Sequence, residues 1–444
     1  MPEERTDPGD TGRGLLRRGA QGVSRVRRTV TRRPRVFLYL SVIGPGVITA
    51  CAGNDAGGIA TFASVGADYG YKLIWLLIPL TLSLGIVQEM CARMGAVTGK
   101  GLSDLVRERF GVRWTAFIML ALLIANGGVT VSEFVGIAAA MELLGVARYV
   151  SVPIAAIAIW WLVVKGSYQR VERVFLAMSL VFLAYVVSAF LAHPPWGTVA
   201  IELVHPHLDF TPAYLLSFVA IIGTTISPYM QVFIQSSVVE KGVRLENYRM
   251  IRTDVWIGTV FAILIVFFIV VSTAATLNIH GEHVDSAEQA ARALRPLAGP
   301  YAEILFAIGL FGASMLAAGV LPLATAYSIS EAFGFEKGVS SSFREAPIFL
   351  GVFTFLVAVG AFIAMIPGLP LIRVLIVTQV INGMLLPVVL IAILRLVNNR
   401  ELMGAYVNGR LYNFAAWLTA LVVSALSILL IVVTLFPNLL SHPG

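Results

Sequence analysis

Charged residues are scarce in this chain. Of its 444 residues, 13% are Asp, Glu, Lys or Arg and 58% are hydrophobic, whereas about a quarter of the residues of a soluble domain are charged. This deficit excludes an ordinary soluble domain. It indicates an integral membrane protein that crosses the lipid bilayer several times.

Cysteine and enzyme motifs are lacking as well. The two cysteines, Cys51 and Cys91, lie inside apolar runs and are interpreted as small buried residues, which excludes a disulfide framework. The chain has no HExxH, GxSxG or CxxC motif. We therefore expect neither an enzyme nor a bound cofactor.

Long apolar runs are abundant. A helix needs about 20 apolar residues to cross the hydrocarbon core, and these runs are too uniformly apolar for barrel strands, which alternate. The sequence predicts an all-α polytopic membrane protein with about 11 transmembrane helices. The expected spans are residues 36–65, 72–95, 114–143, 150–166, 173–193, 211–237, 253–277, 299–329, 346–367, 372–397 and 413–436.

The basic residues predict the orientation. With the N-terminus in the cytoplasm, all but five of the 32 Lys and Arg residues fall on the cytoplasmic side, as the positive-inside rule requires. An odd number of spans then leaves the C-terminus outside. We expect insertion in a bacterial cell membrane. The five exceptions are Lys72, Arg148, Arg292, Arg295 and Arg373.

The positive charge is concentrated in the first 35 residues. Residues 1–35 hold ten arginines and supply most of the net charge of +7. This segment is interpreted as a disordered basic cytoplasmic tail that lies on anionic lipid, not as a nucleic-acid-binding module. The lipid bilayer is therefore an expected partner and nucleic acid is not. The sequence predicts no particular oligomeric state.

Two spans are interrupted near the middle. Span one contains "CAGNDAGG", which places Asp55 among small residues, and span six contains "GTTISPY" with Pro228. A carboxylate in the bilayer costs about 2.5–3.5 kcal/mol on insertion scales, so a functional role is expected. Broken helices near the midplane are typical of transport sites. The breaks lie five spans apart, which indicates two related halves.

The residues at the breaks predict a cation site. Asp55 adds negative charge, and Thr224, Thr225 and Ser227 add oxygen atoms, whereas no Cys or His is present there. Oxygen ligands favour hard ions such as Mg²⁺, Ca²⁺ or Mn²⁺. The nearest soft atom is the sulfur of Met230. Asn54 is either a further ligand or a cap of the second half-helix.

The stretch "VQEMCARMGAVTGKGLSDLVRERFG" (residues 87–111), the Gly-Pro-Gly at 44–46 and the break at Asp55 together resemble the Nramp family of divalent metal transporters. The resemblance implies a LeuT-like fold with two inverted five-helix repeats, unwound helices 1 and 6, and alternating access. We assign residues 36–193 to the first repeat, 211–397 to the second, and 413–436 to an additional helix 11.

The departures from the family pattern predict the cargo. Nramp transporters carry Asp-Pro-Gly-Asn in span one, and here Gly58 stands in place of the asparagine ligand. In span six, Ser227 replaces the family's methionine and Tyr229 replaces a histidine. These changes remove the sulfur and leave space for a partly hydrated ion. The chain thus looks like the Nramp-related magnesium transporters, and we expect Mg²⁺, with Mn²⁺ also carried.

Proton coupling is not expected. The family uses histidines in span six and an acidic pair in span three; here Glu133 is present, whereas Thr130 replaces the aspartate. All six histidines are predicted at or beyond the outer face. Glu133 is interpreted either as part of the ion path or as a buried neutral packing acid.

Other polar residues complete the expected site. Gln379 matches a family position that approaches the metal, with helix-to-helix hydrogen bonding as the alternative. Thr130, Tyr229 and Gln231 are also expected on or near the ion path. Two alternative functions remain: a proton-coupled Mn²⁺ or Fe²⁺ transporter, and a sodium-coupled amino-acid transporter of the same architecture.

Overall fold

The apolar runs fold into helices close to their predicted bounds. A computed structural model describes residues 45–435 except 167–169, 172, 175–176, 178–182, 210, 244, 285–286 and 293–301. The predicted tail, residues 1–35, and the first residues of span one lie outside this described part. The described residues form one compact unit by their contacts.

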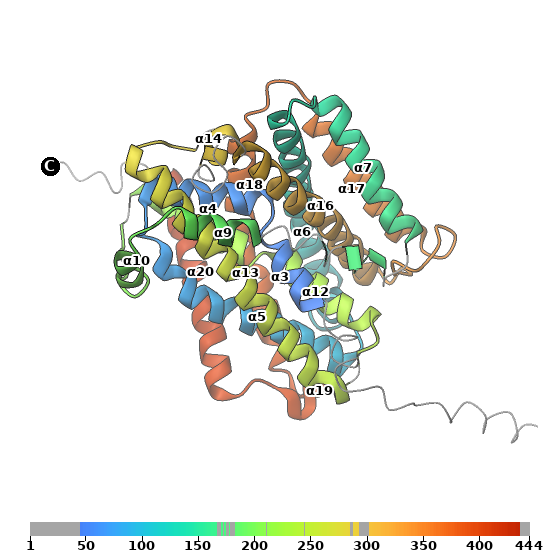
Figure 1. The fold of residues 1–444 in the computed structure, drawn as a ribbon. Helices are drawn as coiled ribbons and strands as arrows, with labels where there is room; N and C mark the ends of the chain where they lie inside the picture. The colour runs from blue at the N-terminus through green and yellow to red at the C-terminus, as the bar shows by residue number, and fades with distance from the viewer. Residues whose placement is uncertain are drawn as a thin grey trace, which may run out of the picture. The chain divides into compact units, whose positions relative to one another are not determined.

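All regular structure among the described residues is helical (Figure 1). The predicted spans correspond to these helices, with α10, α14 and α19 in connections. The helices are α3 (Pro45–Ala52), α4 (Ala56–Tyr69), α5 (Leu77–Thr98), α6 (Leu102–Leu143), α7 (Arg148–Lys165), α9 (Leu183–Leu191), α10 (Trp196–Glu202), α11 (Pro212–Thr225), α12 (Pro228–Glu240), α13 (Tyr248–Thr276), α14 (Ala287–Arg292), α16 (Ala302–Phe333), α17 (Pro347–Ala364), α18 (Leu371–Val397), α19 (Arg400–Met403) and α20 (Arg410–Leu435).

Nine segments within the described residues are long and apolar enough to cross a membrane. Span one, which is divided into the short helices α3 and α4, is not among them. The described part of span five, α9, is also short. Span three begins after Gly111, whose φ of 77° separates the first turns of α6 from the rest.

The two predicted interruptions have local causes. Pro228 lacks an N–H and disfavours helical backbone at the residue before it. Accordingly, Ser227 is extended (φ −69°, ψ 138°), α11 ends at Thr225, and α12 begins at Pro228. In span one, Asp55 is extended (ψ −179°) and its carboxylate caps α4. Both spans are therefore unwound where the sequence predicts it.

The helices of the two halves pack against each other in a reciprocal way. The half-helices of span one, α3 and α4, pack on α13 of span seven, and α12 of span six packs on α5 of span two. Span three (α6) packs most extensively on span eight (α16), and α7 lies beside α17 (Figure 1). Each pairing is what two halves related by a five-span shift would produce. The boundaries 36–193 and 211–397 stay a prediction.

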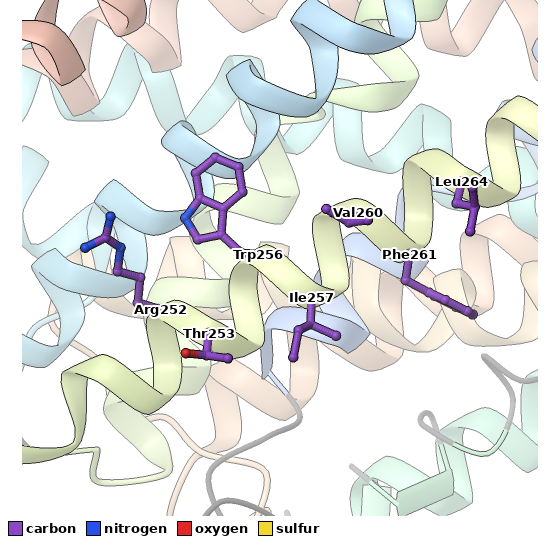
Figure 2. A pocket seen from close by; sticks show the side chains of 7 residues that line it. All are labelled: Arg252, Thr253, Trp256, Ile257, Val260, Phe261 and Leu264. Carbon is purple, nitrogen blue, oxygen red and sulfur yellow. The ribbon is translucent and has the colours of Figure 1, made fainter. Parts of the chain in front are cut away.

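The outward face of α13 is apolar. Ile257, Val260 and Leu264 are each about half exposed. Figure 2 shows these side chains along a groove that ends at Arg252. Trp256 in the same groove turns inward and lies over Gly85 of α5, where a Cβ would be 2.5 Å from its ring. Exposed aliphatic side chains on a span are expected to contact lipid.

Candidate metal site

Asp55 lies at the break in span one and is fully buried. Its Oδ1 accepts a 2.6 Å hydrogen bond from the backbone N–H of Gly58, which caps α4. Across the interface, Gln379 Nε2 of α18 donates to Oδ1 and Oδ2 at 3.0 and 3.1 Å. Among the residues that the structure describes, no Lys or Arg forms an ion pair with this carboxylate. The site therefore carries a carboxyl group without a cationic partner.

The carboxyl group of Glu133, on α6, also binds the first turn of α4. Its Oε2 accepts a 3.1 Å hydrogen bond from the N–H of Ala56, the residue after Asp55. Its Oε1 accepts from the hydroxyl of Ser132 at 3.3 Å. Glu133 is thus fully buried next to the break. Both interpretations given above, ion path and packing acid, are compatible with this position.

Three oxygen atoms converge on Gly58. A Cβ placed on this glycine would lie 2.8 Å from Thr224 Oγ1, 3.0 Å from the carbonyl oxygen of Gly53 and 3.2 Å from Asp55 Oδ1. Thr224 Oγ1 in turn approaches the Gly53 carbonyl at 3.4 Å. A carboxylate, a hydroxyl and a backbone carbonyl are the ligands that hard divalent cations prefer. The absence of a side chain at Gly58 permits this approach.

Close packing holds the Gln379 side chain against the break in span one. A Cβ on Gly57 would lie 2.2 Å from its Nε2, so only glycine allows the amide to reach Asp55. Its Oε1 is buried and makes no hydrogen bond to any residue that the structure describes. This oxygen is a further acceptor beside the carboxylate. Gln379 thus forms the helix-to-helix hydrogen bond that was one of its two interpretations, and its role as a metal ligand stays a prediction.

Ser227, at the break in span six, is engaged with its own helix and with α18. Its hydroxyl lies 2.7 Å from the carbonyl of Gly223 and accepts from Asn382 Nδ2 at 2.8 Å. Asn382 Oδ1 has no hydrogen-bond partner among the described residues. Ser227 is therefore near the site, and Asn382 of α18, which joins the two spans by this hydrogen bond, adds another carbonyl oxygen.

The remaining predicted residues occupy distinct positions. Asn54 Nδ2 donates to the Ala262 carbonyl of α13 at 3.1 Å, and the cap of α4 is Asp55, so the interpretation of Asn54 as a cap is wrong. Tyr229 donates its hydroxyl to the Ala52 carbonyl, the end of α3, at 2.7 Å. Gln231 donates to the Ser227 carbonyl at 3.4 Å.

Thr130 and the histidines lie apart from the oxygen cluster. The Thr130 hydroxyl donates to the Asn126 carbonyl of its own helix, and its methyl group lies against Gly360 of α17. Of the six histidines, His442 is outside the described residues. His193, His205, His280 and His283 are exposed, and His207 is partly so.

Met230 is closer to the break than the sequence suggests. A Cβ on Gly53 would lie 2.6 Å from Met230 Cε and 3.2 Å from its sulfur. The thioether therefore packs on the backbone that supplies the Gly53 carbonyl. No local signal predicts this contact, because it depends on how α12 is rotated against α3.

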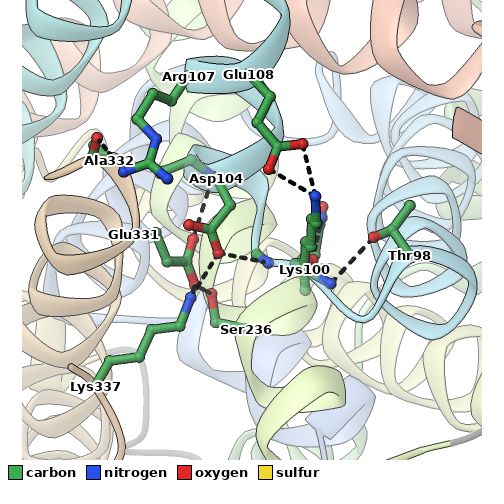
Figure 3. Close-up of polar contacts among 12 residues, drawn as sticks. Thr98, Lys100, Asp104, Arg107, Glu108, Ser236, Glu331, Ala332 and Lys337 are labelled. Carbon is green, nitrogen blue, oxygen red and sulfur yellow. Dashed lines mark hydrogen bonds and ion pairs between the residues drawn. The ribbon is translucent and has the colours of Figure 1, made fainter. Parts of the chain in front are cut away.

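A polar network joins three helices beyond the site (Figure 3). Glu331 of α16 is buried and accepts from the Ser103 N–H of α6 at 3.2 Å and from the Ser236 hydroxyl of α12 at 2.6 Å. Lys337 binds both Glu331 and Asp104, at 3.2 and 2.7 Å. Ser236 is nine residues past Ser227 in sequence, about 13 Å along a helix. The network holds these helix ends together on the side predicted to be cytoplasmic.

The chain is similar to known proteins over most of its length. A family model described as natural resistance-associated macrophage protein-like (Nramp) matches residues 46–433. The divalent metal cation transporter MntH of Deinococcus radiodurans is 29% identical over 445 residues, and the alignment covers 96% of each chain.

Solved structures show a similar fold. The manganese transporter of Eremococcus coleocola matches with a TM-score of 0.73 at 18% identity, over 93% of this chain and 90% of that chain. Mhp1, a nucleobase-cation-symport-1 family transporter, matches with a TM-score of 0.53 at 15% identity, over 89% and 91%. The predicted all-helical, LeuT-like fold is confirmed by these matches. The prediction of a transporter is confirmed by the family model and by the curated relative.

Proposed function

Because the chain belongs to the Nramp family, we propose that it carries divalent metal ions across a membrane by alternating access, with Mg²⁺ as the preferred ion, Mn²⁺ as a second, and no coupling to protons. Divalent metal transport is supported by the MntH relative, itself a divalent metal cation transporter. The preference for Mg²⁺ and the lack of coupling are inferred from this chain's own residues.

The observation that carries the proposal is the oxygen cluster around Asp55. Asp55 Oδ1, Thr224 Oγ1 and the Gly53 carbonyl meet over Gly58, and the Gln379 Oε1 atom beside them makes no hydrogen bond among the described residues. Mg²⁺ binds oxygen in octahedral geometry at about 2.0–2.1 Å and retains several waters in most sites. A small set of protein oxygens with an adjacent free amide carbonyl suits an ion that keeps part of its hydration shell.

The lack of coupling rests on which titratable groups face the site. Thr130 stands where the family has an aspartate, and its hydroxyl bonds back to its own helix. Ile234 stands where the family has its second span-six histidine. The membrane potential alone supplies about 4.6 kcal/mol per 100 mV to a divalent ion, from 2.3 per charge. No second driving ion is needed for inward transport.

One observation favours a second candidate, a proton-coupled carrier of Mn²⁺ or Fe²⁺. The Met230 thioether packs on Gly53, and Glu133 is within reach of the α4 start. A sulfur ligand favours softer ions over Mg²⁺. A buried carboxyl group beside the metal site offers a place for a proton.

The two candidates are separated by uptake into proteoliposomes that contain a pH-sensitive dye. We expect Mg²⁺ to enter without a change of internal pH. Asp55→Asn should reduce uptake at least about tenfold, because it removes the negative charge that attracts the cation. The local fold should survive, since asparagine caps a helix as well as aspartate does. Asp68→Asn, at the other end of α4, is the matched control and should transport normally.

Two results contradict the proposal. Absence of Mg²⁺ entry with intact Mn²⁺ entry would remove the magnesium preference. Internal acidification that rises with metal uptake would establish the proton-coupled alternative instead.

A further inference from the structure

A second group of metal-ligand side chains lies outside the transport site. Glu202, His205 and His207 place one oxygen and two ring nitrogens within 4.8 Å of one another. Within the part of the chain that the structure describes, no other three His, Cys, Asp or Glu side chains meet in this way. The group lies between spans five and six, on the side predicted to face outward.

The backbone that presents the three residues is anchored at both ends. Glu202 is the last residue of α10, and the two histidines follow in the connection to α11. The hydroxyl of Tyr214, in the first turn of α11, donates to the carbonyl of His207. The Tyr214 ring packs edge-on against Tyr69 at the end of α4, with ring centroids 5.5 Å apart. The loop is thus fixed to α4 and α11.

The side chains already point toward one another. His207 Nε2 lies 2.5 Å from Glu202 Oε2, and the rings of His205 and His207 have centroids 4.8 Å apart. Tetrahedral ligands about 2.1 Å from a zinc ion are roughly 3.4 Å from each other. The side chains of Glu202 and His207 are 23% and 34% exposed. Small rotations of these partly exposed side chains are sufficient to admit an ion between them.

We propose that Glu202, His205 and His207 form an external binding site for a borderline transition-metal ion of the Zn²⁺ class. Two imidazoles and one carboxylate are a common protein ligand set for Zn²⁺, and water completes the coordination. Mg²⁺ prefers oxygen ligands and binds weakly to imidazole. The chain therefore has two sites of opposite preference, an all-oxygen site at the breaks and a nitrogen-rich site on the surface.

The ion would bridge α10 and the connection into α11. Glu202 belongs to α10, whereas His207 is fixed to α11 through Tyr214. A ligand that binds the folded state alone stabilises it in proportion to the logarithm of its concentration over Kd. The segment that precedes the span-six break should accordingly become more resistant to unfolding when the ion is bound.

The test is isothermal titration calorimetry of Zn²⁺ into the full chain, purified in detergent with its affinity tag removed. Asp55→Asn serves as the background, so that binding at the transport site does not obscure the result. We expect one Zn²⁺ to bind. Loss of a side chain that only orients a metal ligand weakens metal affinity by roughly 10- to 100-fold. His205→Ala or His207→Ala removes a ligand itself and should weaken Zn²⁺ affinity by more than that.

The controls lie on the same predicted face. His193→Ala and His280→Ala alter exposed histidines outside the group and should leave Zn²⁺ affinity unchanged. Each variant in the Asp55 wild-type background should still carry Mg²⁺, which shows that it is folded. His205→Cys replaces one zinc ligand by another and should retain binding.

Unchanged Zn²⁺ affinity in the His205→Ala/His207→Ala double variant would overturn the proposal, as would Mg²⁺ competing with Zn²⁺ at equal concentration. Zn²⁺ binding that is lost in the double variant and kept in His205→Cys would support it.

Discussion

At the scale of single residues, the two oxygens of Asp55 have different environments. Oδ1 accepts from the Gly58 N–H at the start of α4 and from Gln379, whereas Oδ2 accepts, among the described residues, only from Gln379. An ion that binds Oδ2 leaves the helix cap in place. The side chain can thus bind a cation without loss of the local fold.

Selectivity between Mg²⁺ and softer ions such as Mn²⁺ and Cd²⁺ depends on whether a thioether sulfur reaches the ion. Ser227→Met restores a thioether at the position where the family has one. We expect preference for Mn²⁺ and Cd²⁺ over Mg²⁺ to rise by on the order of tenfold, which corresponds to about 1.4 kcal/mol. The measurement is competition of each ion against Mg²⁺ uptake, and an unchanged profile would count against Ser227 as a site residue.

Met230→Leu is the counterpart of that variant. Leucine has nearly the volume of methionine, so the packing on Gly53 should survive at a cost below about 1.5 kcal/mol. If oxygen alone binds the cargo, the ratio of Mg²⁺ to Mn²⁺ uptake should stay within about twofold of the parent, well under the tenfold worth 1.4 kcal/mol. A selective loss of Mn²⁺ uptake would make the Met230 sulfur a ligand and favour the second candidate function.

At the scale of elements, α11 and α18 approach each other closely enough to fix the position of Gln379. A Cβ on Gly223 would lie 2.2 Å from the Gln379 carbonyl oxygen and 2.6 Å from the Gly383 nitrogen. Both neighbours are backbone atoms and have little freedom to move aside. The distance between these two helices therefore decides whether the Gln379 amide reaches Asp55.

Gly223→Ala should separate the two helices. We expect destabilisation of about 1–3 kcal/mol, typical of overpacking, together with reduced Mg²⁺ uptake. Gly351→Ala is the control, because no atom outside its own turn lies within 4 Å of the added methyl group. Thermal unfolding in detergent measures both variants. Equal melting temperatures would show that the contact is not tight.

The helices were predictable at this scale and their side-chain contacts were not. Apolar runs, Pro228 and the small residues around Asp55 are local signals, and they gave the span bounds and both breaks. The contacts of Gln379 with Asp55 and of Asn382 with Ser227 join residues 324 and 155 positions apart. Such pairs depend on the rotation of one helix against another, which periodicity does not encode. The cap of α4 is a different, local case: Asn54 and Asp55 are neighbours with similar capping tendency, and Asp55 is the one that accepts from Gly58 N–H.

At the scale of the whole molecule, span one packs on span seven and span six packs on span two. This reciprocal packing joins the two halves at the breaks. Two rigid halves that share a central site are suited to expose it to each side in turn. The polar network at Glu331 joins α6, α12 and α16 on the side of the molecule that is predicted to be cytoplasmic. Its position relative to the membrane follows from the predicted orientation, with the N-terminus inside.

Transport driven by voltage alone has a measurable limit. In proteoliposomes with an imposed potential of 100 mV, negative inside, we expect Mg²⁺ to accumulate up to roughly 2,000-fold, since about 4.6 kcal/mol is available and 1.4 kcal/mol is a factor of ten. A pH gradient imposed at constant potential should not change this final ratio. Accumulation that follows the pH gradient would contradict uncoupled transport.

The bare backbone at Gly58 limits which side chains this position can take. Three oxygens lie within 3.2 Å of the place a Cβ would occupy, so an asparagine introduced at position 58 would collide with them before it could bind an ion. A single Gly58→Asn substitution should therefore not create a working amide ligand unless Thr224 and the Gly53 carbonyl shift as well.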